Sequence, residues 1–416
     1  MDVVVTGIGL ISALGNLKNS WQRLLAGDSG IERHQPFLEL EPRLLALIDT
    51  KPADLITLTR QVLADALQDA DLTLPLPDCG VVMGSSRGFQ ANLEQLAREG
   101  SSATDSVTDV TDVRQKEEGT GEKEEGRECT MPNAQCPMPD SRFPIPNSQF
   151  VDFLPHMVAI AVAREIGSMG PVLAPMAACA TGLQSIARAV DLIRTGECQR
   201  AIAGAVEAPI TPLTVAGFSR MGALANTGCY PFDEHREGFV LGEGGALFVL
   251  ESAELASHRG AKVYGRISGF GLTNDACYAN APELGGESAI AAVNQCLKRS
   301  NLSAVDIDFI HAHGTATELN DRHEALLIQK LFQQGVAVSS TKGATGHTLG
   351  ASGALGVAFC LMGIKYQMLP PCAGMKKPGF ELDFVRFARS TIVRNALCLS
   401  FGFGGQNAAI VLSGDR

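Results

Sequence analysis

Hydrophobic and polar positions along the chain form two kinds of segment, short apolar runs and longer stretches with helical spacing. The chain begins with the apolar run VVVTGIGLIS, followed by two amphipathic stretches, NSWQRLLAG and ITLTRQVLADALQDA, and a second apolar run, CGVVMGSS. This alternation predicts an α/β fold. We expect the first strand to end in a tight turn at Gly7 and Gly9. Ser12 stands where a dinucleotide-binding motif needs its third glycine, so we discount that function.

The same alternation resumes after residue 149. The predicted elements are the strand GPVLAPMAAC, the helix ATGLQSIARAVDLIRTG, the strand RAIAGAVEA, a strand pair near GFVLGEGGALFVLE, the helix SAIAAVNQCLKRS, the strand DIDFIHAHG, the helix DRHEALLIQKLF, the strand VAVSST, a helix of small residues, and the closing strands NALCLSF and NAAIVLS. Two of these segments place Ala-Thr-Gly just after a strand and continue into a small-residue helix, ACATGLQSIARAVDLIRTG and KGATGHTLGASGALGVAFCLMGIKY. This echo predicts a duplicated α/β half, residues 1–262 and 263–416, with the two helices sharing a central layer.

Residues 101–149 interrupt this pattern. They contain ten acidic against five basic residues, and their second part, MPNAQCPMPDSRFPIP, holds five prolines. Low hydrophobicity, charge and proline together predict a flexible surface insertion. The alternative is a segment that docks a partner.

Composition narrows the class of protein. A chain of 416 residues with 45% hydrophobic content is typical of a soluble globular protein, and no apolar run approaches the roughly 20 residues of a membrane helix. No basic region precedes the first strand, so we expect no secretory signal. Eleven cysteines without CxxC spacing predict reduced thiols in the cytoplasm and no structural zinc. The net charge of −11 argues against nucleic-acid binding.

Cys179, in the segment APMAACATGLQ, lies at a predicted strand-to-helix junction. A helix N-terminus stabilises a thiolate, so the pKa of Cys179 is expected to fall below the ordinary value of about 8.5. Such a thiol is a candidate nucleophile. The alternative is a small buried cysteine with a packing role.

Three further segments join glycine-rich turns to reactive side chains. In HAHGTATELND, His311 and His313 lie two residues apart at a strand end, where His313 is well placed to face a cleft; a metal site is not expected there. In SSTKGATGHTLGASG, Lys342 and His347 flank a turn that opens a helix; the alternatives are a solvated lysine and a first-turn histidine. The loop SFGFGGQN offers backbone N–H groups for an oxyanion hole. Together these groups suit thioester chemistry.

The motifs ACATG, PFDEHREGFVLGEGG, HAHGTATELND, STKGATGH and SFGFGGQN occur in this order along the chain. In this respect the chain resembles the type II elongating β-ketoacyl-[acyl-carrier-protein] synthases of the thiolase-fold superfamily, over nearly its whole length outside the insertion. The resemblance implies a duplicated thiolase-like fold with five layers, α-β-α-β-α, and mixed sheets.

The resemblance also implies a Cys-His-His triad of Cys179, His313 and His347. Cys179 would accept the acyl chain, and the histidines would stabilise the enolate formed when malonyl-carrier loses CO₂. Lys342 would orient this cluster, and the N–H groups of Cys179 and Phe403 would form the oxyanion hole. His347 argues against the chain-starting branch, which uses a Cys-His-Asn set.

The remaining roles implied by the resemblance concern substrate and partners. The expected substrate-binding residues are Phe218, Phe401, Phe403, Thr315, Thr317 and Arg87. No metal or organic cofactor is expected, because the substrates arrive on the phosphopantetheine of an acyl carrier protein. The expected partners are that carrier, acyl and malonyl thioesters, and a second copy of the chain in a cytoplasmic homodimer.

Two residues depart from the family pattern. Gly356 stands where a glutamate that steadies the lysine is expected, and Arg87 stands where the acyl tunnel wall usually has a small or aliphatic residue. The acidic insertion is also atypical. Two alternatives therefore stay open, a ketosynthase of a specialised lipid or polyketide pathway and a non-condensing partner subunit that sets chain length. The joint presence of Cys179, His313 and His347 argues against the second.

Overall fold

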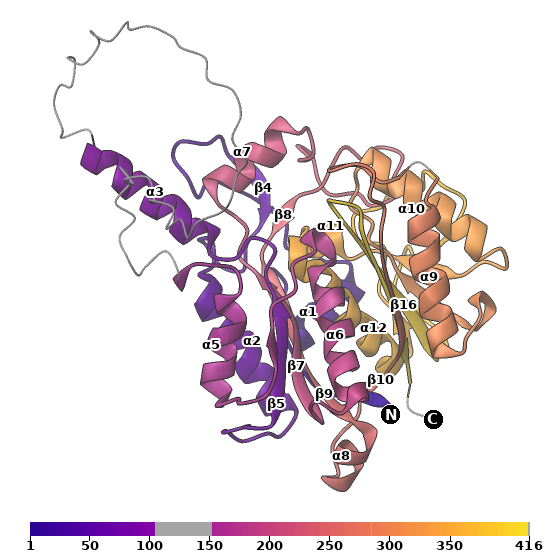
Figure 1. Cartoon of the computed structure of the whole chain (residues 1–416). Helices are drawn as coiled ribbons and strands as arrows, with labels where there is room; N and C mark the ends of the chain where they lie inside the picture. The colour runs from indigo at the N-terminus through magenta and orange to yellow at the C-terminus, as the bar shows by residue number, and fades with distance from the viewer. Residues whose placement is uncertain (105–151, 284, 415–416) are drawn as a thin grey trace, which may run out of the picture. The chain divides into compact units, whose positions relative to one another are not determined.

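The computed structural model describes residues 1–104, 152–283 and 285–414 (Figure 1). The chain forms two compact units, one made of Met1–Gln90 with Leu154–Arg416 and the other of Ala91–Phe153. The helix α3 (Gln90–Thr104) runs four residues into the predicted insertion. Residues 105–149 of that segment lie outside the described residues, so its predicted flexibility stays a prediction.

The larger unit is built on a twelve-stranded mixed sheet with the order β14-β12-β11-β16-β17-β10-β1-β9-β7-β5-β6, in which β2 also pairs with β1. Its strands are β1 (Val3–Ser12), β2 (Gly15–Asn16), β5 (Cys79–Gly84), β6 (Val172–Leu173), β7 (Arg200–Glu207), β9 (Gly244–Ser252), β10 (Gly265–Asn274), β11 (Phe309–His311), β12 (Ala337–Ser339), β14 (Asp383–Phe384), β16 (Asn395–Gly402) and β17 (Gln406–Ser413). Two small sheets join β3 (Glu32–His34), β4 (Arg43–Ala46) and β8 (Leu241–Gly242), and β13 (Met368–Leu369) with β15 (Arg389–Ser390).

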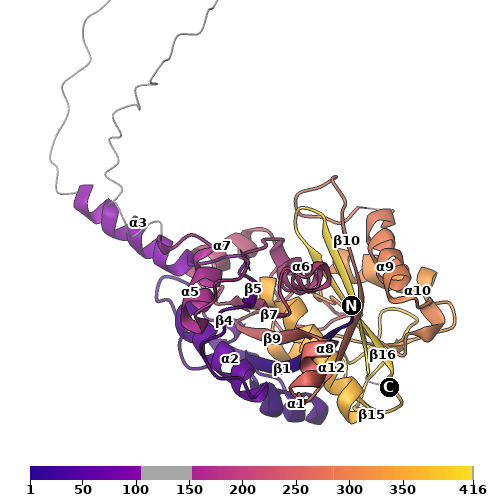
Figure 2. The ribbon, with the colours of Figure 1, turned by 60° about the horizontal axis from the view of Figure 1, so that its bottom comes forward.

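Helices enclose this sheet in layers. They are α1 (Leu17–Ala26), α2 (Leu55–Asp69), α5 (Met157–Ile166), α6 (Thr181–Thr195), α7 (Pro212–Arg220), α8 (Ala253–His258), α9 (Glu287–Ser300), α10 (Glu318–Leu331), α11 (Lys342–Thr345) and α12 (Ser352–Tyr366), with the short 3-10 turns η1 (Ala178–Ala180), η2 (Ala304–Asp306) and η3 (Leu349–Ala351). Helices α6 and α12 pack against each other between the two halves of the sheet. Figure 2 views α6 nearly end-on, with α2 and α5 on one side and α9 and α10 on the other. The predicted five-layer α/β fold is confirmed.

Glycines in β1 and β10 explain how the outer helices approach the sheet. A Cβ atom on Gly9 would overlap the carbonyl of Val62 in α2, and one on Gly271 would overlap the carbonyl of Ala292 in α9. The strand β1 runs through its glycines to Ser12, so the predicted glycine turn was wrong. This close approach occurs in both halves, because β1 packs at its glycine against the backbone of α2 and β10 packs at its glycine against the backbone of α9. The similarity supports the predicted duplication.

The central layer is duplicated as well, but the residues that correspond between the two halves differ from those that the sequence suggested. The turns η1 and η3 each precede a helix of 15 residues, and each starts at a residue with positive φ, 46° at Ala178 and 44° at Leu349. The second Ala-Thr-Gly, residues 344–346, lies before η3 and is not the counterpart of the first. The two helices meet at small residues, since a Cβ on Gly182 would lie 2.8 Å from the Ala354 nitrogen.

Two strands near the central helices are shorter than predicted. In the segment GPVLAPMAAC only Val172–Leu173 forms a strand, which lies at the edge of the sheet. In the segment DIDFIHAHG only Phe309–His311 forms a strand. The prediction that no apolar run approaches the length of a membrane helix was wrong for Leu349–Tyr366. These 18 residues are apolar and long enough to cross a membrane, yet 89% of the stretch is buried inside the protein. It is therefore the core helix of the duplicated fold.

Candidate active site

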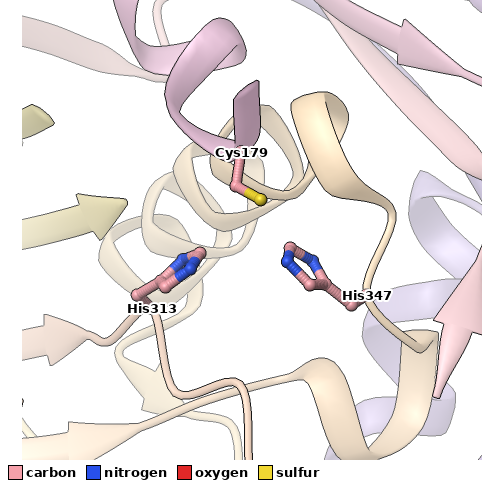
Figure 3. Close-up of side chains that lie close together, drawn as sticks. All are labelled: Cys179, His313 and His347. Carbon is pink, nitrogen blue, oxygen red and sulfur yellow. The ribbon is translucent and has the colours of Figure 1, made fainter. Parts of the chain in front are cut away.

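Cys179 lies in η1, immediately before α6, where the polypeptide turns from the sheet edge into the central layer. The preceding residue, Ala178, has a φ of 46°, a conformation that costs energy for a residue with a side chain. The turn directs the sulfur into the space between His313 and His347 (Figure 3). The sulfur and one ring nitrogen of each histidine all lie within 4.8 Å of one another.

The main chain at His313 is fixed by two charged side chains. Its N–H donates to Oε1 of Glu324 at 2.6 Å, the next N–H, of Gly314, donates to Oε2 at 2.7 Å, and its carbonyl accepts from Nζ of Lys342. The carboxylate of Glu324 is fully buried, on α10. Glu324 was not among the predicted site residues, although its place in the polar helix after HAHGTATELND could have suggested it. The predicted orienting role of Lys342 therefore has a geometric basis in its bond to the His313 carbonyl.

His347 follows α11 and is held by its ring as well as its backbone. Its Nδ1 hydrogen-bonds the Ser352 hydroxyl at 2.8 Å, and its N–H donates to the Val240 carbonyl at 2.7 Å. The ring centroids of His347 and His313 are 5.5 Å apart and nearly perpendicular, at 81°. One ring nitrogen of His347 is thereby committed to the protein and the other is left for chemistry.

Burial determines the protonation of both histidines. Desolvation holds the pKa of His313 and that of His347 well below 6.5, and the charge of Lys342 lowers both further. Burial also lowers the pKa of Lys342 itself, while the carboxylate of Glu324 opposes that shift. Both imidazoles are neutral at neutral pH, so each can donate one hydrogen bond and accept one.

The predicted low pKa of Cys179 was wrong. Burial raises the pKa of this thiol to about 11, and the positive charge of Lys342 only partly opposes the effect. The helix N-terminus does not offset the cost of moving a thiolate out of water. Cys179 is therefore a thiol at neutral pH and needs a base to release its proton.

A cavity of about 440 Å³ opens onto these three side chains. Besides the triad it is lined by the predicted substrate-binding residues Phe218, Phe401, Phe403, Thr315 and Thr317. Arg87 does not line it. Its guanidinium lies 5.2 Å from the ring centroid of Phe218, in contact with the wall rather than with the cavity.

The loop SFGFGG crosses beside the amide of Cys179. A Cβ atom on Gly402 would lie 3.1 Å from the Cys179 nitrogen, and the Ser400 hydroxyl donates to the Cys179 carbonyl at 2.9 Å. Phe403 follows at the mouth of the cavity, with 41% of its surface exposed. These contacts bring the loop to the amide that the predicted oxyanion hole uses.

His311 turns away from the cavity, because β11 ends at that residue and His313 no longer shares its face. Its Nε2 hydrogen-bonds the Thr341 hydroxyl at 3.1 Å, and a Cβ on Gly356 would lie 2.7 Å from its Nδ1. The imidazole thus lies where a side chain at position 356 would begin. Glu324 supplies the carboxylate beside Lys342 that the glycine at 356 cannot.

The triad is also the one group of side chains within residues 1–104, 152–283 and 285–414 arranged so that it could hold a metal ion. One sulfur and two imidazole nitrogens are donors that zinc accepts. The same three groups can carry an acyl chain on sulfur and stabilise an enolate with two neutral donors. A cysteine between two neutral histidines, at the base of a pocket in a duplicated five-layer fold, defines an acyl-transferring enzyme of the thiolase-like class.

Comparison with known proteins identifies the family within that class. The chain belongs to the β-ketoacyl synthase family: residues 119–256 match its N-terminal domain and residues 264–376 its C-terminal domain. A curated relative from Staphylococcus aureus (strain COL), 3-oxoacyl-[acyl-carrier-protein] synthase 2, is 32% identical over 445 aligned residues, covering 98% of this chain and 97% of the relative.

A second curated relative agrees with this assignment, and a solved structure shares the fold. The mitochondrial 3-oxoacyl-[acyl-carrier-protein] synthase of Arabidopsis thaliana is 32% identical, covering 99% of this chain and 93% of the relative. A solved structure of a type II polyketide acyl-carrier protein in complex with its ketosynthase, bound to the hexaketide, superposes with a TM-score of 0.85 at 24% identity, covering 100% and 99% of the two chains. The predicted family, fold and acyltransferase class are confirmed, and the main interpretation, a condensing enzyme of fatty-acid elongation, holds.

Proposed function

We propose that this chain joins an acyl group held on Cys179 to the two-carbon unit of malonyl-[acyl-carrier-protein], releasing CO₂ and forming β-ketoacyl-carrier protein. The observation that carries the proposal is the thiol of Cys179 between two imidazoles that burial keeps neutral. Neutral imidazoles can accept a proton in one step and donate hydrogen bonds in the other.

The first step is acyl transfer. The Cys179 thiol passes its proton to a neutral ring nitrogen of the triad as the sulfur attacks the carbonyl carbon of acyl-carrier. The C–S bond to the carrier then breaks, and the carrier leaves as a thiol by taking up that proton. The N–H groups of Cys179 and Phe403 stabilise the oxyanion between these events.

The second step is condensation. The C–C bond to the carboxylate of malonyl-carrier breaks, CO₂ leaves, and the electron pair forms an enolate whose oxygen accepts hydrogen bonds from His313 and His347. The enolate carbon attacks the Cys179 thioester, forming the new C–C bond. The C–S bond to Cys179 breaks, and the thiolate becomes the free thiol by taking up one proton from solvent water.

No metal or organic cofactor enters these steps, because the thioester activates both carbonyl carbons. Lys342 and Glu324 act as positioning residues, since both bind the main chain around His313 and neither lines the cavity. The lysine also keeps both imidazoles neutral through its charge.

An acyl carrier protein is the proposed partner, as it is for the ketosynthase in the solved complex. A second copy of the chain is the other. The edge strand β6 exposes Val172 and Leu173 by 37% and 39%, and nearby Met176 is 57% exposed. An apolar sheet edge favours pairing with another strand.

The nine described cysteines are unpaired, which supports the proposed cytoplasmic location.

The proposal is tested by incubating the purified protein with malonyl-carrier and acyl-carriers of several lengths, then analysing products by mass. We expect a β-ketoacyl-carrier two carbons longer than the primer, formed equally well with a metal chelator present. Loss of product with the chelator, restored by zinc, would contradict the cofactor-free mechanism. Absence of product with every primer would indicate the alternative of a non-condensing partner subunit.

A further inference from the structure

Arg87 lies in a turn that is locked to the active-site wall. The fully buried carboxylate of Glu207 accepts hydrogen bonds from the Ser85 and Ser86 hydroxyls, from the N–H groups of Ser86 and Arg87 at 2.9 and 3.0 Å, and from the N–H of Gly350 at 3.0 Å. Gly350 is part of η3, which begins with the cavity-lining Leu349. The backbone at Arg87 is therefore fixed relative to the cavity.

The guanidinium of Arg87 has an aromatic partner. It lies 5.2 Å from the ring centroid of Phe218, a distance typical of a cation–π contact. Phe218 is buried and packs edge-to-face on Phe239 at 5.2 Å. Within the described ranges no carboxylate forms an ion pair with Arg87, and both oxygens of Glu207 are already engaged by five donors.

The wall beside Cys179 separates the sulfur from the turn that carries Arg87. Cys179 packs against the apolar cluster that contains Phe218 and Leu349. The turn that carries Ser86 and Arg87 contacts η3 directly, next to Leu349, because a Cβ on Gly350 would lie 3.0 Å from the Cβ of Ser86. An acyl chain lying between Phe218 and Leu349 would therefore have the Arg87 turn directly behind its wall.

We propose that Arg87 selects acyl chains that carry an oxygen acceptor, a carboxylate or a ketone, over hydrocarbon chains of the same length. The inference rests on the proposed function and names the substrate class of that site. A half-buried cation that finds no carboxylate partner in the described part of the chain is a poor neighbour for methylene groups, which offer it no hydrogen bonds. An oxygen on the acyl chain would satisfy its donors while Phe218 keeps the planar group in place.

The test measures transfer of acyl groups from carrier protein to the enzyme, followed by intact mass. Succinyl-, glutaryl- and adipyl-carriers are each compared with the butyryl-, valeryl- and hexanoyl-carriers of equal length, and acetoacetyl-carrier with butyryl-carrier. The variants are Arg87→Leu and Arg87→Lys. Arg60→Leu serves as a matched control, because that arginine is 65% exposed on α2 and pairs with Glu165.

We expect the wild type and Arg60→Leu to favour one oxygenated series by at least about tenfold in kcat/KM, as for a hydrogen bond to a charged group. Arg87→Leu should reverse this preference, and Arg87→Lys should retain part of it. The carboxylate and ketone series distinguish the two kinds of acceptor. A wild type that prefers plain chains, or an unchanged ratio in Arg87→Leu, would overturn the inference even though condensation continues. Failure of every acyl group to transfer would instead overturn the proposed function.

Discussion

Replacing Glu324 with glutamine probes the part of the site that no motif revealed. The carboxylate accepts from the N–H groups of His313 and Gly314 at 2.6 and 2.7 Å and is fully buried. Burial raises the pKa of Glu324 to about 7, so the experiment belongs at about pH 8, where the group is ionised. Glutamine keeps one acceptor oxygen, but its NH₂ faces the second donor.

The expected cost follows from these two bonds. A hydrogen bond to a charged group contributes about 1.5–3 kcal/mol, and a buried donor left unpaired costs a similar amount. Glu324→Gln should therefore lower the free energy of unfolding by about 2–3 kcal/mol. Because the loop carrying His313 shifts, malonyl decarboxylation should also fall by at least about tenfold, or about 1.4 kcal/mol of transition-state stabilisation, while acyl transfer to Cys179 continues.

Urea denaturation gives the stability, and CO₂ release from malonyl-carrier gives the rate. Glu254→Gln, an exposed change of the same charge on α8, is the control. If Glu324→Gln behaves like this control in both measurements, the carboxylate does not position His313 and the reasoning fails.

The remaining predictions concern the histidines, the thiol and the central helix. His313→Ala and His347→Ala should each accept an acyl group but lose about 2–4 kcal/mol of transition-state stabilisation in decarboxylation; wild-type condensation by either variant would show a wrong assignment. Alkylation of Cys179 by iodoacetamide should accelerate about tenfold per pH unit up to its raised pKa of about 11, whereas a plateau near the ordinary thiol pKa would contradict the effect of burial. Gly356→Ala should lower the free energy of unfolding by about 1–3 kcal/mol, because its Cβ would lie 2.7 Å from the His311 ring; an unchanged denaturation midpoint would show that the ring can move away.

The fold could be predicted because its elements are strongly patterned. The amphipathic and apolar stretches gave the central and outer helices and the long strands. The glycines of β1 were misinterpreted, because sequence alone does not distinguish a turn from a close approach of a helix, as at Gly9 and Val62. The internal repeat was predicted correctly, but the second Ala-Thr-Gly, at 344–346, lies before η3, and η3 is the true counterpart of η1.

The site was predictable where motifs carried it and not where tertiary packing decided it. Cys179, His313 and His347 converge as expected. Glu324 acts through main-chain N–H groups, which leave no mark on the sequence of the loop they hold. The raised pKa of the thiol depends on burial by distant segments, whereas the helix N-terminus visible in the sequence is a local effect.

The central claim, that Cys179 carries the acyl chain, is tested most directly by intact mass after incubation with acyl-carrier alone. We predict one added acyl group on the wild type, mapped by peptide analysis to Cys179. The same mass should appear on Cys277→Ala, which removes an exposed cysteine, and no added mass should appear on Cys179→Ala. An acyl group that persists on Cys179→Ala would contradict the account.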